Sequence, residues 1–249
     1  MVRFFSSRRF LAIYSGCLTL VFAVTVLTGF SRSWLENASF DQITVRRVNV
    51  VEPNGTVRLV ISDRNEFPGL YLHGKEIKRP DRDDSAGLLF FNDEGTEDGG
   101  LIYGGSKSAS DEAGHGPTSF SHLSFDQYDQ DQTLVLGASL EEGKRTSGVT
   151  LSDVGNFPIT PQFIADAEQW KMMPHGVARA EARAKFLQKY PEGAERGFFG
   201  RQTDDSVGVS LRDTAGNIRA SLTVKPNGEP ALQFLDAAGK VTKEISGNK

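Results

Sequence analysis

An uncharged stretch of 21 residues, Phe10–Phe30, constrains this chain more than any other feature. It follows directly after the pair Arg8-Arg9. An α-helix rises about 1.5 Å per residue, so about 20 apolar residues cross the hydrocarbon core of a bilayer. The sequence therefore predicts a transmembrane helix over residues 10–30, with the lipid bilayer as its partner.

Four interpretations of this segment are weighed, and a retained anchor is favoured. A cleaved secretory signal has a shorter apolar core, although Ser31-Arg32-Ser33 offers a poor cleavage site. A twin-arginine export signal is the third interpretation, but the spacing in Ser7–Leu11 is off by one residue. Lipid attachment at Cys17 is disfavoured, because the apolar run continues well past the cysteine.

The basic residues predict the orientation of the anchor in a cell membrane. Arg3, Arg8 and Arg9 precede the helix, and no acidic residue occurs before Glu36. The positive-inside rule then places residues 1–9 in the cytoplasm and the chain beyond the helix outside it. Residues 31–42 are predicted as a juxtamembrane linker and residues 43–249 as an extracytoplasmic domain.

Charge and cysteine usage exclude several classes of protein. Removing the three N-terminal arginines from 28 basic residues leaves 25 against 32 acidic residues, a net charge of −7 beyond the anchor. Nucleic-acid binding needs a basic surface, so no nucleic-acid partner is expected. Cys17 is the only cysteine and lies in the anchor, which excludes disulfides and cysteine metal sites from the domain.

The domain is predicted to be mainly β, an antiparallel β-meander that forms a sandwich, roll or barrel. Apolar residues alternate with other residues in runs such as 57–62 and 207–212, which suits strands with one face on a core. Turn glycines at positions 216, 228 and 239 are spaced as in consecutive hairpins.

A turn pattern recurs four times: a carboxylate or amide residue, two turn residues, a glycine and a polar residue. The copies begin at Glu52, Asn92, Asp213 and Asp236. The side chain of the first residue can accept backbone N–H bonds, and the glycine takes the positive φ that closes the hairpin. Calcium binding is the sharper interpretation, but each copy offers too few oxygen ligands.

Residues 160–190 interrupt the β pattern and are predicted to be a small helical insertion. They are rich in helix-forming residues, and Pro174 and Gly176 divide them into two helices or kink one. Val177, Ala184 and Leu187, with Tyr190 as an optional fourth member, form a narrow apolar stripe that predicts packing on a sheet. A partner-binding helix or a lid is the alternative. Lys75–Ser85, by contrast, is predicted to be a surface loop of mixed charge.

No motif commits the chain to a reaction, so no catalytic residue, cofactor or metal is predicted. The candidate site is the acidic cluster Asp126, Asp129 and Asp131, which could act in acid–base chemistry or hold a cation. A solvated hairpin connection is the simpler interpretation of the same residues. A metal shell of His115 and His122 with Asp111 or Asp126 is a further alternative, less favoured than surface histidines.

Two segments carry a resemblance to a known family. They are Ile43–Ile61, with the sequence ITVRRVNVVEPNGTVRLVI, and Gly87–Ile102, with the sequence GLLFFNDEGTEDGGLI. Together with Ser124–Gln132 they resemble a family of uncharacterised bacterial membrane-anchored β-rich proteins that has no assigned activity. The resemblance covers about half of the chain and implies a bacterial cell envelope.

The sequence thus predicts a single-pass membrane protein whose domain is a binding or structural module of the cell envelope, not an enzyme. Its expected partner is an envelope protein or a glycan. The alternative is an extracytoplasmic hydrolase that acts on glycans or peptides through the carboxylates of the acidic cluster. Self-assembly through β edges or the helical insertion is a third hypothesis, and the oligomeric state stays open.

Overall fold

The computed structural model describes residues 8–29, 38–79, 82, 84–107 and 117–247. The chain divides into two compact units, Met1–Val45 and Arg46–Lys249. Residues 1–7 and most of the predicted linker 31–42 lie outside the described residues.

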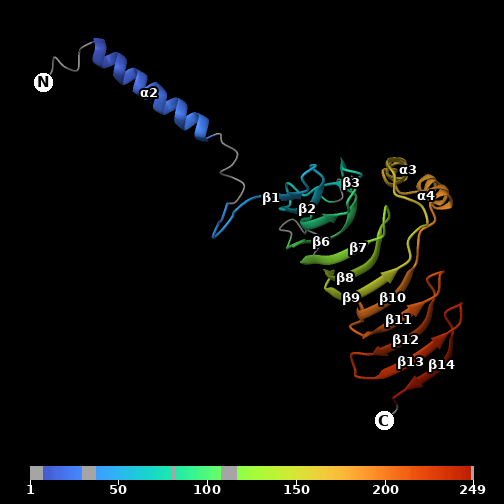
Figure 1. Ribbon diagram of the computed structural model, residues 1–249. Coiled ribbons are helices and arrows are strands. Elements are labelled where there is room, and N and C mark those ends of the chain that lie inside the picture. Colours follow the sequence, from blue (N-terminus) through green and yellow to red (C-terminus); the bar gives the residue numbers. More distant parts are fainter. Residues whose placement is uncertain (1–7, 30–37, 80–81, 83, 108–116, 248–249) are drawn as a thin grey trace. The chain divides into compact units, whose positions relative to one another are not determined.

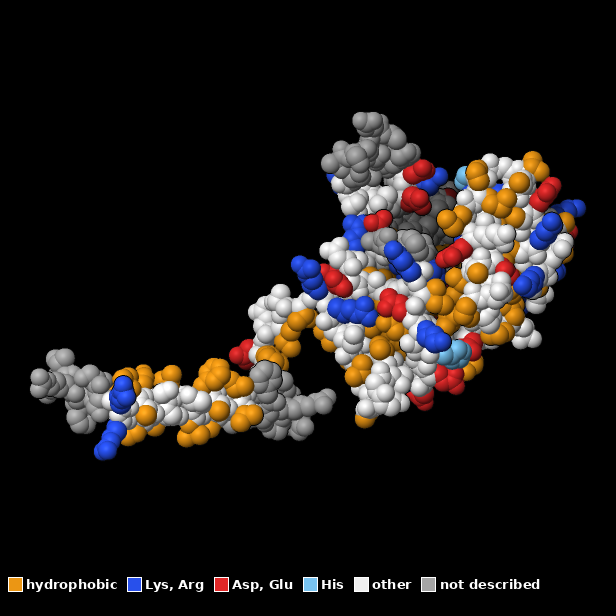
Figure 2. All heavy atoms as spheres, turned by 90° about the horizontal axis from the view of Figure 1, so that it is seen from above, with side chains coloured by type: hydrophobic (Ala, Val, Ile, Leu, Met, Phe, Trp, Pro, Cys, Tyr) orange, Lys and Arg blue, Asp and Glu red, His pale blue; other side chains and the backbone are white. Residues whose placement is uncertain are grey.

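The first unit contains helix α2 (Arg8–Gly29). Its span Arg8–Leu27 is long and apolar enough to cross a membrane, a property that a signal sequence shares. Hydrophobic side chains cover it, and basic side chains occur only at its start (Figure 2). Thr19 and Thr25 donate their hydroxyl protons to carbonyl oxygens four residues earlier. These bonds satisfy the donors of the two threonine hydroxyl groups, which suits an apolar surrounding.

The second unit is built on one antiparallel sheet of twelve described strands, whose spatial order follows the chain (Figure 1). The strands are β1 (Arg47–Val51), β2 (Val57–Ser62), β5 (Ala86–Phe91), β6 (Glu97–Ser106), β7 (Thr118–Asp126), β8 (Gln132–Glu141), β9 (Lys144–Ser152), β10 (Glu195–Arg201), β11 (Val207–Arg212), β12 (Ile218–Val224), β13 (Pro230–Leu235) and β14 (Val241–Ser246). The predicted mainly-β meander is confirmed, and it is a single open sheet with β1 and β14 at its ends.

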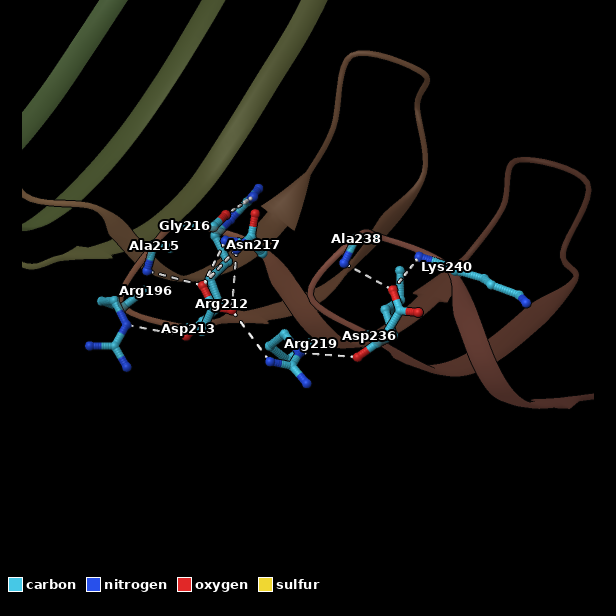
Figure 3. A network of polar contacts seen from close by, with 11 residues as sticks. Arg196, Arg212, Asp213, Ala215, Gly216, Asn217, Arg219, Asp236, Ala238 and Lys240 are labelled. Carbon is cyan, nitrogen blue, oxygen red and sulfur yellow. Dashed lines mark hydrogen bonds and ion pairs between the residues drawn. The ribbon is translucent and has the colours of Figure 1, made fainter.

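The recurrent turns close hairpins, as predicted, and all four lie at the same end of the strands. Asp213 accepts the backbone N–H groups of Ala215 and Asn217, and Asp236 accepts those of Ala238 and Lys240, at 2.9–3.0 Å (Figure 3). Asn92 makes the same pair of bonds in its own turn. The turn that begins at Glu52 differs, because Asn54 supplies the side-chain acceptor. Each turn therefore fixes the register of two strands through local bonds.

A small hairpin, β3 (Leu70–Leu72) and β4 (Lys75–Ile77), covers part of one sheet face. Its Tyr71 packs in one buried cluster with Val60, Leu89 and Ile102 of the sheet. We call the sheet face that carries Val60 and Leu89 the hairpin face, and the opposite one the leucine face. Lys75–Ser85 was predicted to be a surface loop, but it contributes β4 and the largely buried Arg82.

The helical insertion forms α3 (Pro161–Lys171) and α4 (Val177–Lys189) between β9 and β10. Thr160 caps α3 by accepting the N–H of Phe163 at 3.2 Å. The stripe prediction for α4 is wrong: Val177 is 76% exposed, and α4 packs on α3 instead of the sheet. Aromatic contacts of Phe186 and Tyr190 with Phe163, at 5.0–5.3 Å between ring centroids, hold the helix pair together.

Four glycines face one another across neighbouring strands on the hairpin face: Gly137, Gly148, Gly200 and Gly208. A Cβ atom on Gly200 would lie 2.0 Å from the carbonyl oxygen of Ser147 on the adjacent strand. On Gly137 a Cβ atom would meet nothing closer than 3.5 Å. Close backbone approach therefore requires glycine at position 200 and not at position 137.

We predict that Gly200→Ala lowers the free energy of unfolding by about 1–3 kcal/mol, because the β9–β10 pair must shift to admit the methyl group. Gly137→Ala, two members away in the same row of glycines, is the matched control and should leave stability nearly unchanged. Urea unfolding of the full-length protein in detergent checks both variants. Equal effects of the two substitutions would contradict the close approach at Gly200.

Candidate functional site

A cleft of about 1120 Å³ lies where the hairpin, the insertion and the strand ends meet. Its apolar walls come from Leu70 and Leu72 of β3 and from Phe163, Ile164 and Phe186 of the helices. Polar groups at the ends of β6 and β7 and in the β7–β8 turn line another part. An apolar wall with a few convergent polar groups is typical of ligand sites.

A buried ion pair joins the hairpin connection to the sheet in this cleft. Both guanidinium nitrogens of Arg82 donate to the carboxylate of Glu97, at 2.7 and 2.8 Å, and Arg82 also donates to the carbonyl oxygen of Gly69. The two side chains are only 15% and 7% exposed. A bidentate pair of this kind fixes the orientation of both groups.

Asp126 ends strand β7 beside this pair. Burial, together with the negative charges of Glu97, Asp131 and Asp98, raises the pKa of Asp126 to about 8 against the opposing charge of Arg82. Its Oδ1 atom is buried without a hydrogen-bond partner. Asp126 is therefore predominantly a neutral carboxylic acid at pH 7.

The turn after Asp126 positions the segment that leads into the helices. Gln130 is buried, and its side-chain amide donates to the carbonyl oxygens of Gly155 and Phe157 at 2.8 and 2.6 Å. The carbonyl oxygen of Asp129 accepts the N–H of Ile159 at 2.6 Å. The β7–β8 turn thus carries structural contacts as well as carboxylates.

Asp129 has an unusual conformation within this turn. Its φ of 49° is left-handed, a region that aspartate enters more readily than most residues. The Oδ2 atom lies 3.6 Å from Nε2 of His73, while Oδ1 is buried without a partner. Trp170 on α3 likewise has a buried, unpartnered Nε1 and lines the same cleft.

The three aspartates of the predicted acidic cluster, Asp126, Asp129 and Asp131, all line the cleft. They are not a purely solvated connection, because the side chains of Asp126 and Asp129 are largely buried. Sequence reasoning did not identify Arg82, Glu97 or Trp170 as members of this site, and it gave no role to Gln130, which lies between the aspartates. No signal in the sequence marks Arg82, Glu97 and Trp170, since they come from separate segments that only the fold brings together.

The histidine alternative is only partly covered by the structure. His122 lies on β7, where burial lowers its pKa and the charge of Arg82 lowers it further. His115 and Asp111 lie outside the described residues. Within the part of the chain that the structure describes, no group of three or more His, Cys, Asp or Glu residues could hold a metal ion.

Comparison of the chain with protein-family models, with curated proteins and with solved structures finds no match. The resemblance of Ile43–Ile61 and Gly87–Ile102 to an uncharacterised membrane-anchored family therefore stays a prediction.

We predict that the free energy of unfolding of Asp126→Asn increases relative to that of the native protein as pH rises. The pKa of Asp126 is about 8 in the folded protein and about 4 in an unfolded chain. The folded state therefore holds this proton more tightly, and the contribution of Asp126 to stability falls between about pH 4 and pH 8. The difference between variant and native protein should grow by up to about 1.4 kcal/mol per pH unit in that window.

Urea unfolding from pH 4 to pH 9 measures this difference. Asp93→Asn is the matched control, since the side chain of Asp93 is 96% exposed at the β5–β6 turn. A stability difference for Asp126→Asn that does not change with pH would show that the carboxyl group is already ionised at pH 4–5.

Proposed function

We propose that the protein is a membrane-anchored binding module of the bacterial cell envelope, whose domain holds a ligand in the cleft. One observation carries this proposal: three buried polar atoms without partners, on Asp126, Asp129 and Trp170, belong to residues that line the same cleft. Buried polar groups are normally hydrogen-bonded, so unpaired ones in a cleft point to a ligand that completes them.

The chemistry of the cleft favours a ligand with an apolar face and several hydrogen-bond donors. Oδ1 of Asp126 and Oδ1 of Asp129 can accept hydrogen bonds, while Nε1 of Trp170 can donate one. Leu70, Leu72 and the aromatic rings of the helices would pack on the apolar face. Sugars combine such a face with hydroxyl donors, so an envelope glycan is the favoured ligand.

Helix α2 supports the anchored state. Its span has the length and the apolar composition that a bilayer requires. Arg8 and Arg9 at its start favour an N-terminus in the cytoplasm and a domain outside it. The domain with its cleft would then lie on the side of the membrane that holds the envelope material.

A hydrolase is the second candidate function, and the pKa of Asp126 favours it. A carboxyl group that keeps its proton at pH 7 can act as a general acid, and Asp131 supplies a second carboxyl group in the same cleft. Hydrolysis of a glycan and binding of a glycan would use the same ligand contacts. Turnover of the bound ligand distinguishes the two functions.

We predict that soluble envelope glycan fragments change the fluorescence of Trp170. The chain has two tryptophans, so Trp34→Phe leaves Trp170 as the only reporter. Asp126→Leu in this background should weaken binding about tenfold or more, because it removes a buried hydrogen-bond acceptor and keeps the branching and the number of heavy atoms of the side chain. Asp93→Asn, outside the cleft, is the control and should bind like the parent protein.

The same titration separates the alternatives. Binding without release of shorter fragments supports a module, whereas release that is lost in Asp126→Asn supports the hydrolase. If peptides bind and glycans do not, the ligand is a peptide and not a glycan. If neither glycans nor peptides change the emission of Trp170, the cleft is not a binding site for such ligands.

We predict that the full-length chain stays in the membrane with its N-terminus intact. Sodium carbonate should not extract it, and mass spectrometry should find residues 10–30 in the mature protein. Protease added to cells stripped of their outer layers should digest the domain. A mature N-terminus near residue 34 would indicate a cleaved signal. A domain that resists protease in intact cells and is digested only after lysis would indicate the opposite orientation in the membrane.

A further inference from the structure

The leucine face carries two neighbouring rows of side chains that run across all twelve strands of the main sheet. In the first, which we call the leucine row, every member is directly opposite the next one on the adjacent strand. Its members are Val48, Ile61, Leu88, Leu101, Leu123, Leu136, Val149, Phe199, Val209, Leu222, Leu232 and Ile245. All twelve are large and apolar.

The second row lies two residues away on the same face. Its members are Val50, Leu59, Phe90, Gly99, Phe125, Leu134, Leu151, Gly197, Leu211, Ala220, Phe234 and Lys243. Lys243, on the last strand, is the one charged side chain among these twenty-four described positions. Charge is thus absent from the two rows except at their end.

Much of this apolar surface is exposed. Twelve of the side chains in the two rows are 38–59% exposed, among them Leu136, Phe199, Leu222 and Ile245. Aromatic side chains have areas of about 150–250 Å² and the aliphatic ones are somewhat smaller, so twelve half-exposed side chains present on the order of 1,000 Å². The largest apolar patch on a typical monomer is only about 300–600 Å². A surface of this size needs an occupant.

We propose that the leucine face is an interface between two copies of this chain, which pack sheet on sheet. The exposed area exceeds the roughly 800 Å² per partner that a standard stable interface buries. A second copy presents the same row with the same strand spacing, so a two-fold contact is self-complementary. Two sheets that bury one apolar face each form the ordinary core of a β-sandwich.

Charge argues against a lipid surface as the occupant. The chain beyond the anchor has a net charge of −7, from 25 basic and 32 acidic residues, and anionic headgroups attract basic surfaces. Copies held by the proposed anchor would also meet at high effective concentration in the plane of the membrane. This second argument rests on the proposed function, whereas the apolar area does not.

Cysteine cross-linking in membranes tests the interface on the full-length chain. Cys17→Ser removes the only native cysteine. In this background Leu136→Cys, Leu222→Cys and Ile245→Cys each place one thiol on the leucine row. Thr223→Cys and Glu244→Cys are matched controls, since they are the chain neighbours of Leu222 and Ile245 and point to the hairpin face. A bis-maleimide with a reach of about 10 Å spans the distance between packed sheets.

The expected result is a cross-linked dimer from at least one leucine-row position, with loss of the dimer band in both controls. A dimer that disappears when Leu101→Lys is added would strengthen the assignment, provided that the circular dichroism spectrum is unchanged. Equal cross-linking on both faces indicates random collision and overturns the proposal. If the leucine-row thiols react fully with a soluble maleimide but never cross-link, the leucine face is free. If they are shielded from the soluble maleimide and still do not cross-link, another molecule covers the face. Either outcome also overturns the proposal.

Discussion

The packing of the β3–β4 hairpin on the sheet is the contact on which the candidate site depends. Tyr71 lies on Val60, Leu89 and Phe91, and two of these three side chains are fully buried. The next residues on either side, Leu70 and Leu72, face the other way and bury with Ile164 of α3. One three-residue strand therefore connects the sheet to the helices. Without it, the cleft would lose a wall and Arg82 its position.

The polar part of the site follows from where the strands end. Glu97 begins β6, Asp126 ends β7 and Asp131 precedes β8, so all three lie at one edge of the sheet. Their carboxyl groups share a partly buried space with the guanidinium group of Arg82. Burial disfavours the charged form of Asp126, and the neighbouring negative charges disfavour it further, which explains why its pKa is raised. A binding module and a hydrolase could both make use of that proton.

The two faces of the sheet have different compositions, and this difference shapes the interpretation of the second unit. Towards β14 the hairpin face carries small and polar side chains such as Ser210, Ser221 and Gln233. The leucine face has large apolar side chains at the matching positions on all twelve strands of the main sheet. Alternation with period two normally places the apolar side on a core. Here the described chain supplies no second layer for that side, which is why we assign it to a second copy.

Local patterns in the sequence predicted a large part of this fold. The long apolar helix α2, the alternating strands, the carboxylate-glycine turns and the helical insertion all arise from interactions within a few residues. The acidic cluster was also found, because its three aspartates are close in the chain. Its burial was not foreseen, since Glu97 and Arg82 come from other segments. Similarly, the α4 stripe suggested packing on a sheet, but aromatic contacts with α3 decided otherwise.

The sequence by itself determined the apolar span of α2, the strand-and-turn rhythm of the domain and the absence of disulfides. Each depends on composition or on neighbours along the chain. Only the tertiary structure decided that Asp126 is protonated and that twelve apolar side chains from separate strands align in one row. Both depend on contacts between residues that are distant in the sequence. Asp126 is buried beside charged residues from other segments, and the row of apolar side chains depends on the register between neighbouring strands.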